Sequence, residues 1–92
     1  MSKQRPLRKE ILKVTNNSDR EKLLCVEPIG DQVQMKPGKS YEVRIVGGDE
    51  GPMELFVEED KLILYGWNNS DSAVYLDDIR VAGMELPSNP QP

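Results

Sequence analysis

Few groups suited to covalent or acid–base chemistry are present in this sequence, which has no histidine and only one cysteine. Without histidine, neither a Ser-His nor a Cys-His nucleophile can form. Cys25 stands within the apolar run Leu23–Val26, where we expect a small buried side chain rather than an exposed, activated thiolate. The sequence therefore predicts that the protein is not an enzyme and that it uses no cofactor.

Carboxylates are the remaining candidate ligands, and they gather in the predicted turns. Zinc and copper lack imidazole ligands and a second thiolate, whereas Ca²⁺ suits carboxylate oxygens. However, no twelve-residue calcium loop occurs, and the same residues serve well as solvated turns and as charges that protect sheet edges. We therefore predict no metal site. The acidic groups considered are Asp49-Glu50, Glu58-Glu59-Asp60, Asp71 and Asp77-Asp78.

Aromatic side chains form a second kind of candidate site, on the segment 61–67. Ile63, Tyr65 and Trp67 alternate with Leu62 and Leu64, so the two sets point to opposite faces of a strand. The leucines match the predicted core, which leaves the other set outside. An exposed apolar strip usually marks an interface; the alternative is that this face of the sheet is also covered. The candidate interaction surface comprises Phe56, Ile63, Tyr65, Trp67, Asn68 and Asn69.

Short strands separated by turn sequences must position these groups. Pro37-Gly38 fits the centre of a type II turn, and Glu59-Asp60 and Asp77-Asp78 are predicted to close hairpins. The four letters Asn-Asn-Ser-Asp occur at residues 16–19 and again at residues 68–71, and we interpret both as the same loop chemistry used at two strand ends. No window sustains the spacing of an amphipathic helix. Strands are predicted over residues 10–15, 22–26, 32–35, 40–46, 53–57, 61–67, 73–76 and 79–81.

Eight such strands predict an all-β fold, a seven- to eight-stranded antiparallel β-sandwich. Alternation along the strands indicates which side chains fill its core. The predicted core comprises Leu12, Val14, Leu24, Val26, Tyr41, Val43, Ile45, Leu55, Val57, Leu62, Leu64, Val74, Leu76 and Ile79.

Three motifs carry a resemblance to a known type of protein. They are the Asn-rich turn in Val14–Ser18, the Glu-Pro-x-Gly corner in Val26–Asp31 and the Pro-Gly-x turn in Met35–Tyr41. From about Val14 to Trp67, the chain resembles a family of small uncharacterised bacterial β-sandwich proteins. The resemblance implies an immunoglobulin-like or cupredoxin-like Greek key. It implies no catalytic residues and no copper site, since blue copper needs two imidazoles and a thiolate.

Charge and composition divide the 92 residues into three parts. We predict a flexible basic arm over residues 1–9, a β-sandwich domain over residues 10–83 and a disordered Pro-rich tail over residues 84–92. Residues 10–92 hold eight basic and sixteen acidic side chains, and an acidic body argues against binding to nucleic acid. There is no apolar run of the ~18 residues that a membrane helix needs, no secretory leader and no pair of cysteines. These features predict a cytoplasmic protein that does not bind membranes.

Together these observations predict a non-catalytic protein-interaction or assembly module of unknown biological role. Its partner would be an unknown protein or a second copy, bound through a sheet face or an edge strand. The alternative is a small carbohydrate-binding β-sandwich. In that case Trp67 and Tyr65 would stack on the sugar, and Asn68 and Asn69 would supply hydrogen bonds.

Overall fold

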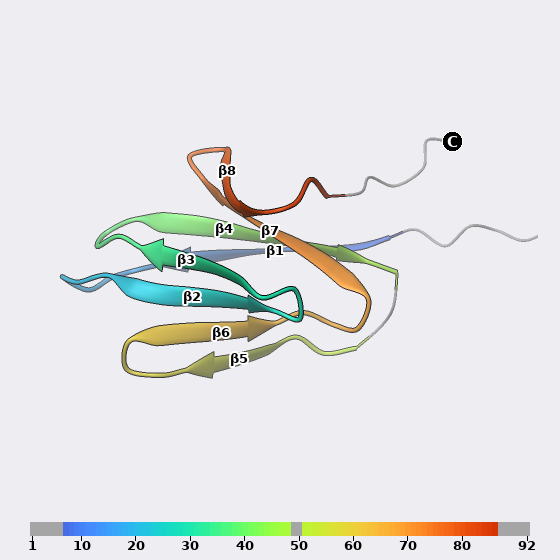
Figure 1. Cartoon of the computed structure of the whole chain (residues 1–92), viewed down its shortest axis with the longest axis horizontal. Helices are drawn as coiled ribbons and strands as arrows, with labels where there is room; N and C mark the ends of the chain where they lie inside the picture. Colours follow the sequence, from blue (N-terminus) through green and yellow to red (C-terminus); the bar gives the residue numbers. More distant parts are fainter. Residues whose placement is uncertain (1–6, 49–50, 87–92) are drawn as a thin grey trace, which may run out of the picture.

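The fold is a two-sheet β-sandwich, seen in a computed structural model that describes residues 7–48 and 51–86 (Figure 1). The described residues contain eight strands and no helix, which confirms the all-β prediction. Sheet A has the strand order β1-β4-β7-β8 and sheet B has the order β3-β2-β6-β5. The strands are β1 (Arg8–Thr15), β2 (Lys22–Glu27), β3 (Asp31–Met35), β4 (Ser40–Gly47), β5 (Glu54–Val57), β6 (Lys61–Tyr65), β7 (Ser70–Leu76) and β8 (Ile79–Gly83).

Strand boundaries match the sequence prediction to within a few residues. β1 begins at Arg8, inside the predicted arm, and the rest of that arm, residues 1–6, lies outside the described residues. β7 begins at Ser70, three residues earlier than predicted. Most of the predicted tail, residues 87–92, also lies outside the described residues. The described residues include no helix long and apolar enough to cross a membrane.

One strand pair departs from the predicted antiparallel arrangement. β2 and β6 are parallel neighbours, with Leu24 paired to Leu62 and Val26 paired to Leu64. Each is the inner strand of an antiparallel hairpin, β2 with β3 and β6 with β5. Both inner strands are continuous apolar runs, as is usual for parallel strands buried in the middle of a sheet. The prediction of a wholly antiparallel sandwich was therefore wrong at the point where the two hairpins meet.

Two of the predicted turns, Pro37-Gly38 and Asp77-Asp78, have backbone geometry that suits their positions in the chain. Gly38 has a φ of 75°, and the Lys39 amide donates to the Lys36 carbonyl at 3.2 Å, as in a type II turn. Asp77 and Asp78 have φ values of 52° and 65°. Two successive positive φ values form the turn type that matches the twist of a two-residue hairpin, and this turn joins β7 to β8.

The two Asn-Asn-Ser-Asp segments do not share one structure, so the interpretation of a common loop chemistry was wrong. The Asn16 side chain is buried, and its amide nitrogen donates to the carbonyls of Arg20 at 2.8 Å and Met35 at 2.9 Å. In the second segment Asn68 and Asn69 form an exposed turn, and Ser70 already belongs to β7. The same letters therefore anchor a loop in one place and begin a strand in the other.

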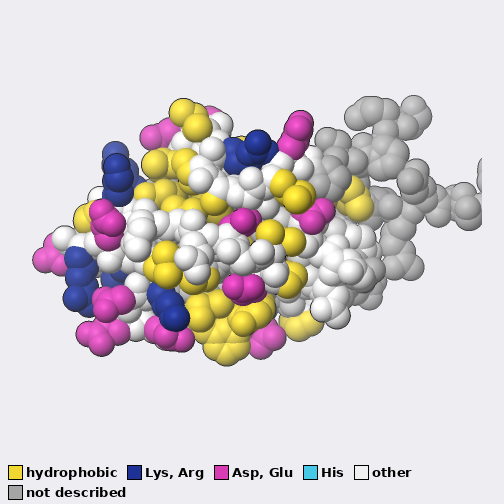
Figure 2. All heavy atoms as spheres, in the orientation of Figure 1, with side chains coloured by type: hydrophobic (Ala, Val, Ile, Leu, Met, Phe, Trp, Pro, Cys, Tyr) yellow, Lys and Arg dark blue, Asp and Glu magenta, His cyan; other side chains and the backbone are white. Residues whose placement is uncertain are grey.

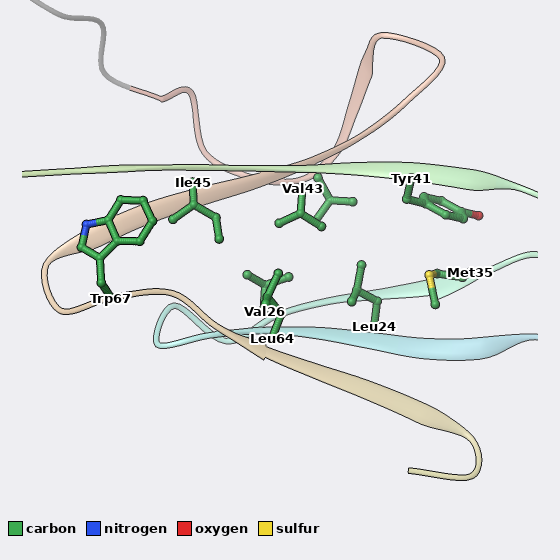
Figure 3. Packing of buried hydrophobic residues seen from close by; sticks show 9 residues of the cluster. Leu24, Val26, Met35, Tyr41, Val43, Ile45, Leu64 and Trp67 are labelled. Carbon is green, nitrogen blue, oxygen red and sulfur yellow. The ribbon is translucent and has the colours of Figure 1, made fainter. Parts of the chain in front are cut away.

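The core lies between the sheets (Figure 3). Tyr41, Val43 and Ile45 of β4 face Leu24 and Val26 of β2, and all five are almost fully buried. Partly buried side chains extend this core at Leu12, Val14, Leu62 and Leu76. The core cluster also includes Met35, Leu64, Trp67 and Val74.

Three predicted core residues are exposed instead. Leu55 is 51% exposed, Val57 is 71% exposed and Ile79 is 67% exposed. Leu55 and Val57 do share a face with Leu64 and Leu62, to which they pair. However, β5 is the edge strand of sheet B, and its inner face is left open. Ile79 begins β8, one of the two edge strands of sheet A, beside the hairpin turn. Alternation along β5 showed correctly which face Leu55 and Val57 occupy. It could not show that sheet A does not extend far enough to cover them.

Candidate interaction surface

Trp67 is the predicted surface residue that the structure places in the core, so its assignment to an exposed strip was wrong. Strand β6 ends at Tyr65, and the Gly66 amide donates to the Glu27 carbonyl at 2.8 Å. This bend breaks the alternation, and the Trp67 side chain turns inward, where it is 2% exposed. A Cβ on residue 66 would lie 2.6 Å from Ser70 Oγ, so the bend depends on glycine. Gly66 was the signal in the sequence that the strand ends before Trp67.

Burial of Trp67 removes the feature on which the carbohydrate alternative depended. A sugar can stack only on an exposed aromatic face, and Tyr65, at 41% exposed, remains without its partner. Asn68 and Asn69 occupy the exposed turn that leads from sheet B to sheet A. A stacking platform of Trp67 with Tyr65 is therefore contradicted.

The other strip residues do meet on the outer face of sheet B. Phe56 pairs with Ile63 on neighbouring strands, and Ile63 pairs with Cys25 on the next strand. The rings of Phe56 and Tyr65 contact edge to face, with centroids 5.6 Å apart and planes at 81°. Phe56 is 47% exposed and Ile63 is half-buried. The structure thus brings together Phe56, Ile63 and Tyr65 and leaves Trp67 out.

The larger apolar feature is strand β5 itself, which sequence reasoning placed in the core. All four of its residues are exposed. Phe56 projects from the outer face while Leu55 and Val57 project from the inner face, so apolar surface is open on both sides. Figure 2 shows hydrophobic side chains gathered along the lower edge of the molecule, where Figure 1 places β5 and β6. We call the side chains of Leu55, Phe56, Val57 and Tyr65 the β5 surface.

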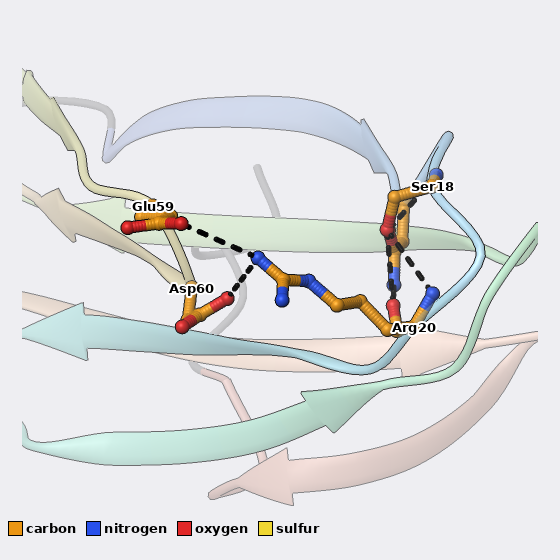
Figure 4. Close-up of polar contacts among 5 residues, drawn as sticks. Ser18, Arg20, Glu59 and Asp60 are labelled. Carbon is orange, nitrogen blue, oxygen red and sulfur yellow. Dashed lines mark hydrogen bonds and ion pairs between the residues drawn. The ribbon is translucent and has the colours of Figure 1, made fainter.

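Acidic residues border the β5 surface. Glu54 begins the strand, and Glu58, Glu59 and Asp60 follow it, all exposed. Two of them form ion pairs with Arg20, as Figure 4 shows: Arg20 Nη2 lies 2.7 Å from Asp60 Oδ1 and 3.8 Å from Glu59 Oε1. Ion pairs this exposed contribute little stability. Their main effect is a negative border around an apolar strand.

Within residues 7–48 and 51–86, the carboxylates considered as calcium ligands form no group of three or more Cys, Asp or Glu side chains that could hold a metal ion. Asp49-Glu50 lies outside the described residues. Cys25 is buried at 7% exposed, as predicted, although it lies on the outer face of sheet B rather than between the sheets.

Comparison of the chain with known protein families, curated proteins and solved structures found no match. Any functional conclusion must therefore rest on the geometry of this chain.

Proposed function

We propose that the protein is a non-catalytic interaction module that binds an extended protein segment along the β5 surface. The observation that carries the proposal is the exposure of Leu55, Phe56 and Val57 on an edge strand. An added strand would satisfy the open backbone edge of β5 and cover side chains on both of its faces. Natural edge strands are usually blunted by charges or bulges, whereas the three consecutive residues 55–57 are apolar.

The free energies of burial and association favour a binding role for the whole strand. Single exposed apolar residues are ordinary. Burying one Leu, Val or Phe side chain contributes about 1.5–3 kcal/mol, whereas association costs about 4–15 kcal/mol before any net affinity appears. Three apolar side chains on one strand, with Tyr65 beside them, are enough to offset much of that cost once backbone hydrogen bonds are added.

Three predictions from the sequence remain predictions. They are the resemblance to immunoglobulin-like or cupredoxin-like bacterial proteins, the cytoplasmic location and the absence of nucleic-acid binding. The last agrees with the acidic border of the β5 surface, because exposed carboxylates repel phosphates.

Selection of short random peptides on the immobilised chain tests the proposal. Counter-selection uses the double variant Leu55→Lys, Val57→Lys, because lysines on an edge strand oppose strand addition. We expect enriched peptides with alternating apolar residues that bind the double variant about tenfold or more weakly. Ile79→Lys, at an equally exposed site on sheet A, is the control and should retain binding. Peptides that bind all three proteins equally, or no enrichment at all, would contradict the proposal.

A further inference from the structure

Strand β1, at one edge of sheet A, carries a charge pattern opposite to that of the β5 region. Along β1, Lys9 and Lys13 flank Ile11, and all three project from the exposed face of the strand. Around β5, Glu54 and Glu58 flank Phe56 at the same spacing. Ile11 is 66% exposed and Phe56 is 47% exposed. Each edge therefore presents an apolar residue between two like charges, and the two edges have opposite sign.

Both edges lie on the same side of the sandwich. β3 contacts β8, and these strands stand at one end of their respective sheets. The opposite ends, β5 of sheet B and β1 of sheet A, must therefore share the other side. In Figure 1, β4 and β6 point in the same direction. Their antiparallel neighbours β1 and β5 therefore run in the same direction as each other.

We infer that the partner of the β5 surface is a second copy of this chain, whose β1 pairs with β5. The inference rests on the proposed function and names its partner. A twofold axis that runs along the strands within the shared side exchanges the two layers and keeps the strand direction. It sets β5 of each copy parallel to β1 of the other, so both pairings form at once. The dimer has two continuous eight-stranded sheets and a self-complementary interface, the commonest form among homo-oligomers.

One register between β5 and β1 pairs opposite charges or apolar residues at nearly every position. With Phe56 opposite Ile11 in this parallel pair, Glu54 lies opposite Lys9 and Glu58 lies opposite Lys13, all on the outer face. On the inner face the same register sets Val57 opposite Leu12, which is only partly buried in the single chain. The mismatch is Leu55 opposite Glu10. Opposite charges and apolar pairs facing each other across a ladder are both stabilising.

Charge also disfavours the pairing of like strands. If β5 paired with β5 about Phe56, each Glu54 would face a Glu58 of the second copy, and like charges directly opposite each other are destabilising. If β1 paired with β1 about Ile11, each Lys9 would face a Lys13. The charges therefore select the mixed β1–β5 pairing.

Paired charge reversals test this dimer. The first variant is Lys9→Glu, Lys13→Glu, and the second is Glu54→Lys, Glu58→Lys. Each reversal makes β1 and β5 of its own chain alike in sign, so four attractive pairs per dimer become repulsive. By sedimentation equilibrium at low salt, we expect the wild-type chain to dimerise and each variant to self-associate about a hundredfold or more weakly. An equimolar mixture of the two variants restores every opposite-charge pair and should form a heterodimer.

The control is Lys36→Glu, Lys39→Glu, which changes the net charge as the first variant does but in the exposed turn before β4. It should dimerise like the wild-type chain, and added salt should weaken both dimers. A monomeric wild-type chain, reversal variants that still dimerise, or a mixture that stays monomeric would overturn the inference. The peptide selection, repeated on the Lys9→Glu, Lys13→Glu variant with its β5 intact, separates the two ideas: peptide binding without wild-type dimers leaves the proposed function standing and removes only the inferred partner.

Discussion

The guanidinium group of Arg8 lies over the indole ring of Trp67, with Cζ 4.0 Å from the ring centroid. Arg8 also donates from Nη1 to the Gly51 carbonyl at 2.6 Å and from Nε to Glu10 Oε2 at 3.1 Å. The first residue of β1 therefore covers the side chain that fills one end of the core (Figure 3). Cation–π contact and burial together make Trp67 a residue of packing rather than of recognition.

Replacing Trp67 with alanine should lower the free energy of unfolding by about 3–5 kcal/mol, because it removes the largest fully buried side chain. Urea denaturation followed by circular dichroism measures the loss. Tyr65→Ala is the comparison: its ring is partly exposed and contacts Phe56 edge to face, so we expect a cost of about 0.5–1.5 kcal/mol. Equal costs for the two variants would show that Trp67 is not the end of the core.

Most of the fold could be predicted from the sequence because its signals are local. Proline, glycine and Asp-Asp pairs mark turns through the φ values that they allow. Alternation in Ser40–Val46 shows which side chains face the core. These signals act over a few residues, so strand positions, the Pro37-Gly38 turn and the burial of Val43 and Ile45 were correct.

The errors concern relations that no short segment encodes. Leu55 and Val57 alternate like core residues, but whether sheet A covers them depends on how far it extends. The parallel contact of β2 with β6 depends on the order in which two hairpins meet. Trp67 continues the period of Ile63 and Tyr65 in the sequence, and only the bend at Gly66 reverses its direction. Sequence reasoning therefore placed the candidate surface on the β5–β6 hairpin, but it included Trp67, which is buried, and left out Leu55 and Val57, which are exposed.

Asn16 should matter far more than its counterpart in the second Asn-Asn-Ser-Asp segment. Its amide nitrogen satisfies the Met35 and Arg20 carbonyls, and its Oδ1 accepts from the Ser18 hydroxyl at 2.6 Å. Asn16→Ala leaves buried polar groups without partners, which we expect to cost about 2–3 kcal/mol. Asn68→Ala, in an exposed turn, should change stability by no more than about 0.5 kcal/mol. Urea denaturation of both variants provides the measurement, and a larger loss for Asn68→Ala would contradict the asymmetry.

The Cys25 thiol should react slowly in the native protein. It is 7% exposed and lies between Gln32 and Ile63 on the neighbouring strands. Because a thiol reagent must reach the sulfur, labelling by a coloured disulfide requires local opening of sheet B. We expect rapid labelling in denaturant and labelling about a hundredfold or more slower in buffer, since opening of a core strand is rare. Fast stoichiometric labelling of the native chain would show that this face of the sheet is open.

Two adjacent glycines, the last residue of β4 and the residue after it, provide a matched test of the packing around Trp67. A Cβ on Gly47 would lie 2.7 Å from the Asn69 carbonyl oxygen, 2.8 Å from Ser70 Cα and 2.8 Å from Trp67 Nε1. Two of these neighbours are backbone atoms and cannot move aside cheaply, so Gly47→Ala should cost about 3 kcal/mol. It should also shift the fluorescence of Trp67, the single tryptophan of the chain.

Gly48→Ala is the control for this test. A Cβ on Gly48 meets no described atom within 4 Å, and its φ lies outside the left-handed region. Alanine at this position should therefore leave stability unchanged or raise it by about 0.4–1 kcal/mol, since it restricts the unfolded chain. The measurements are thermal unfolding and tryptophan emission, compared between Gly47→Ala and Gly48→Ala. If Gly47→Ala unfolds like the wild-type chain with unchanged emission, the close approach of β4 to the turn at Asn69 does not exist in solution.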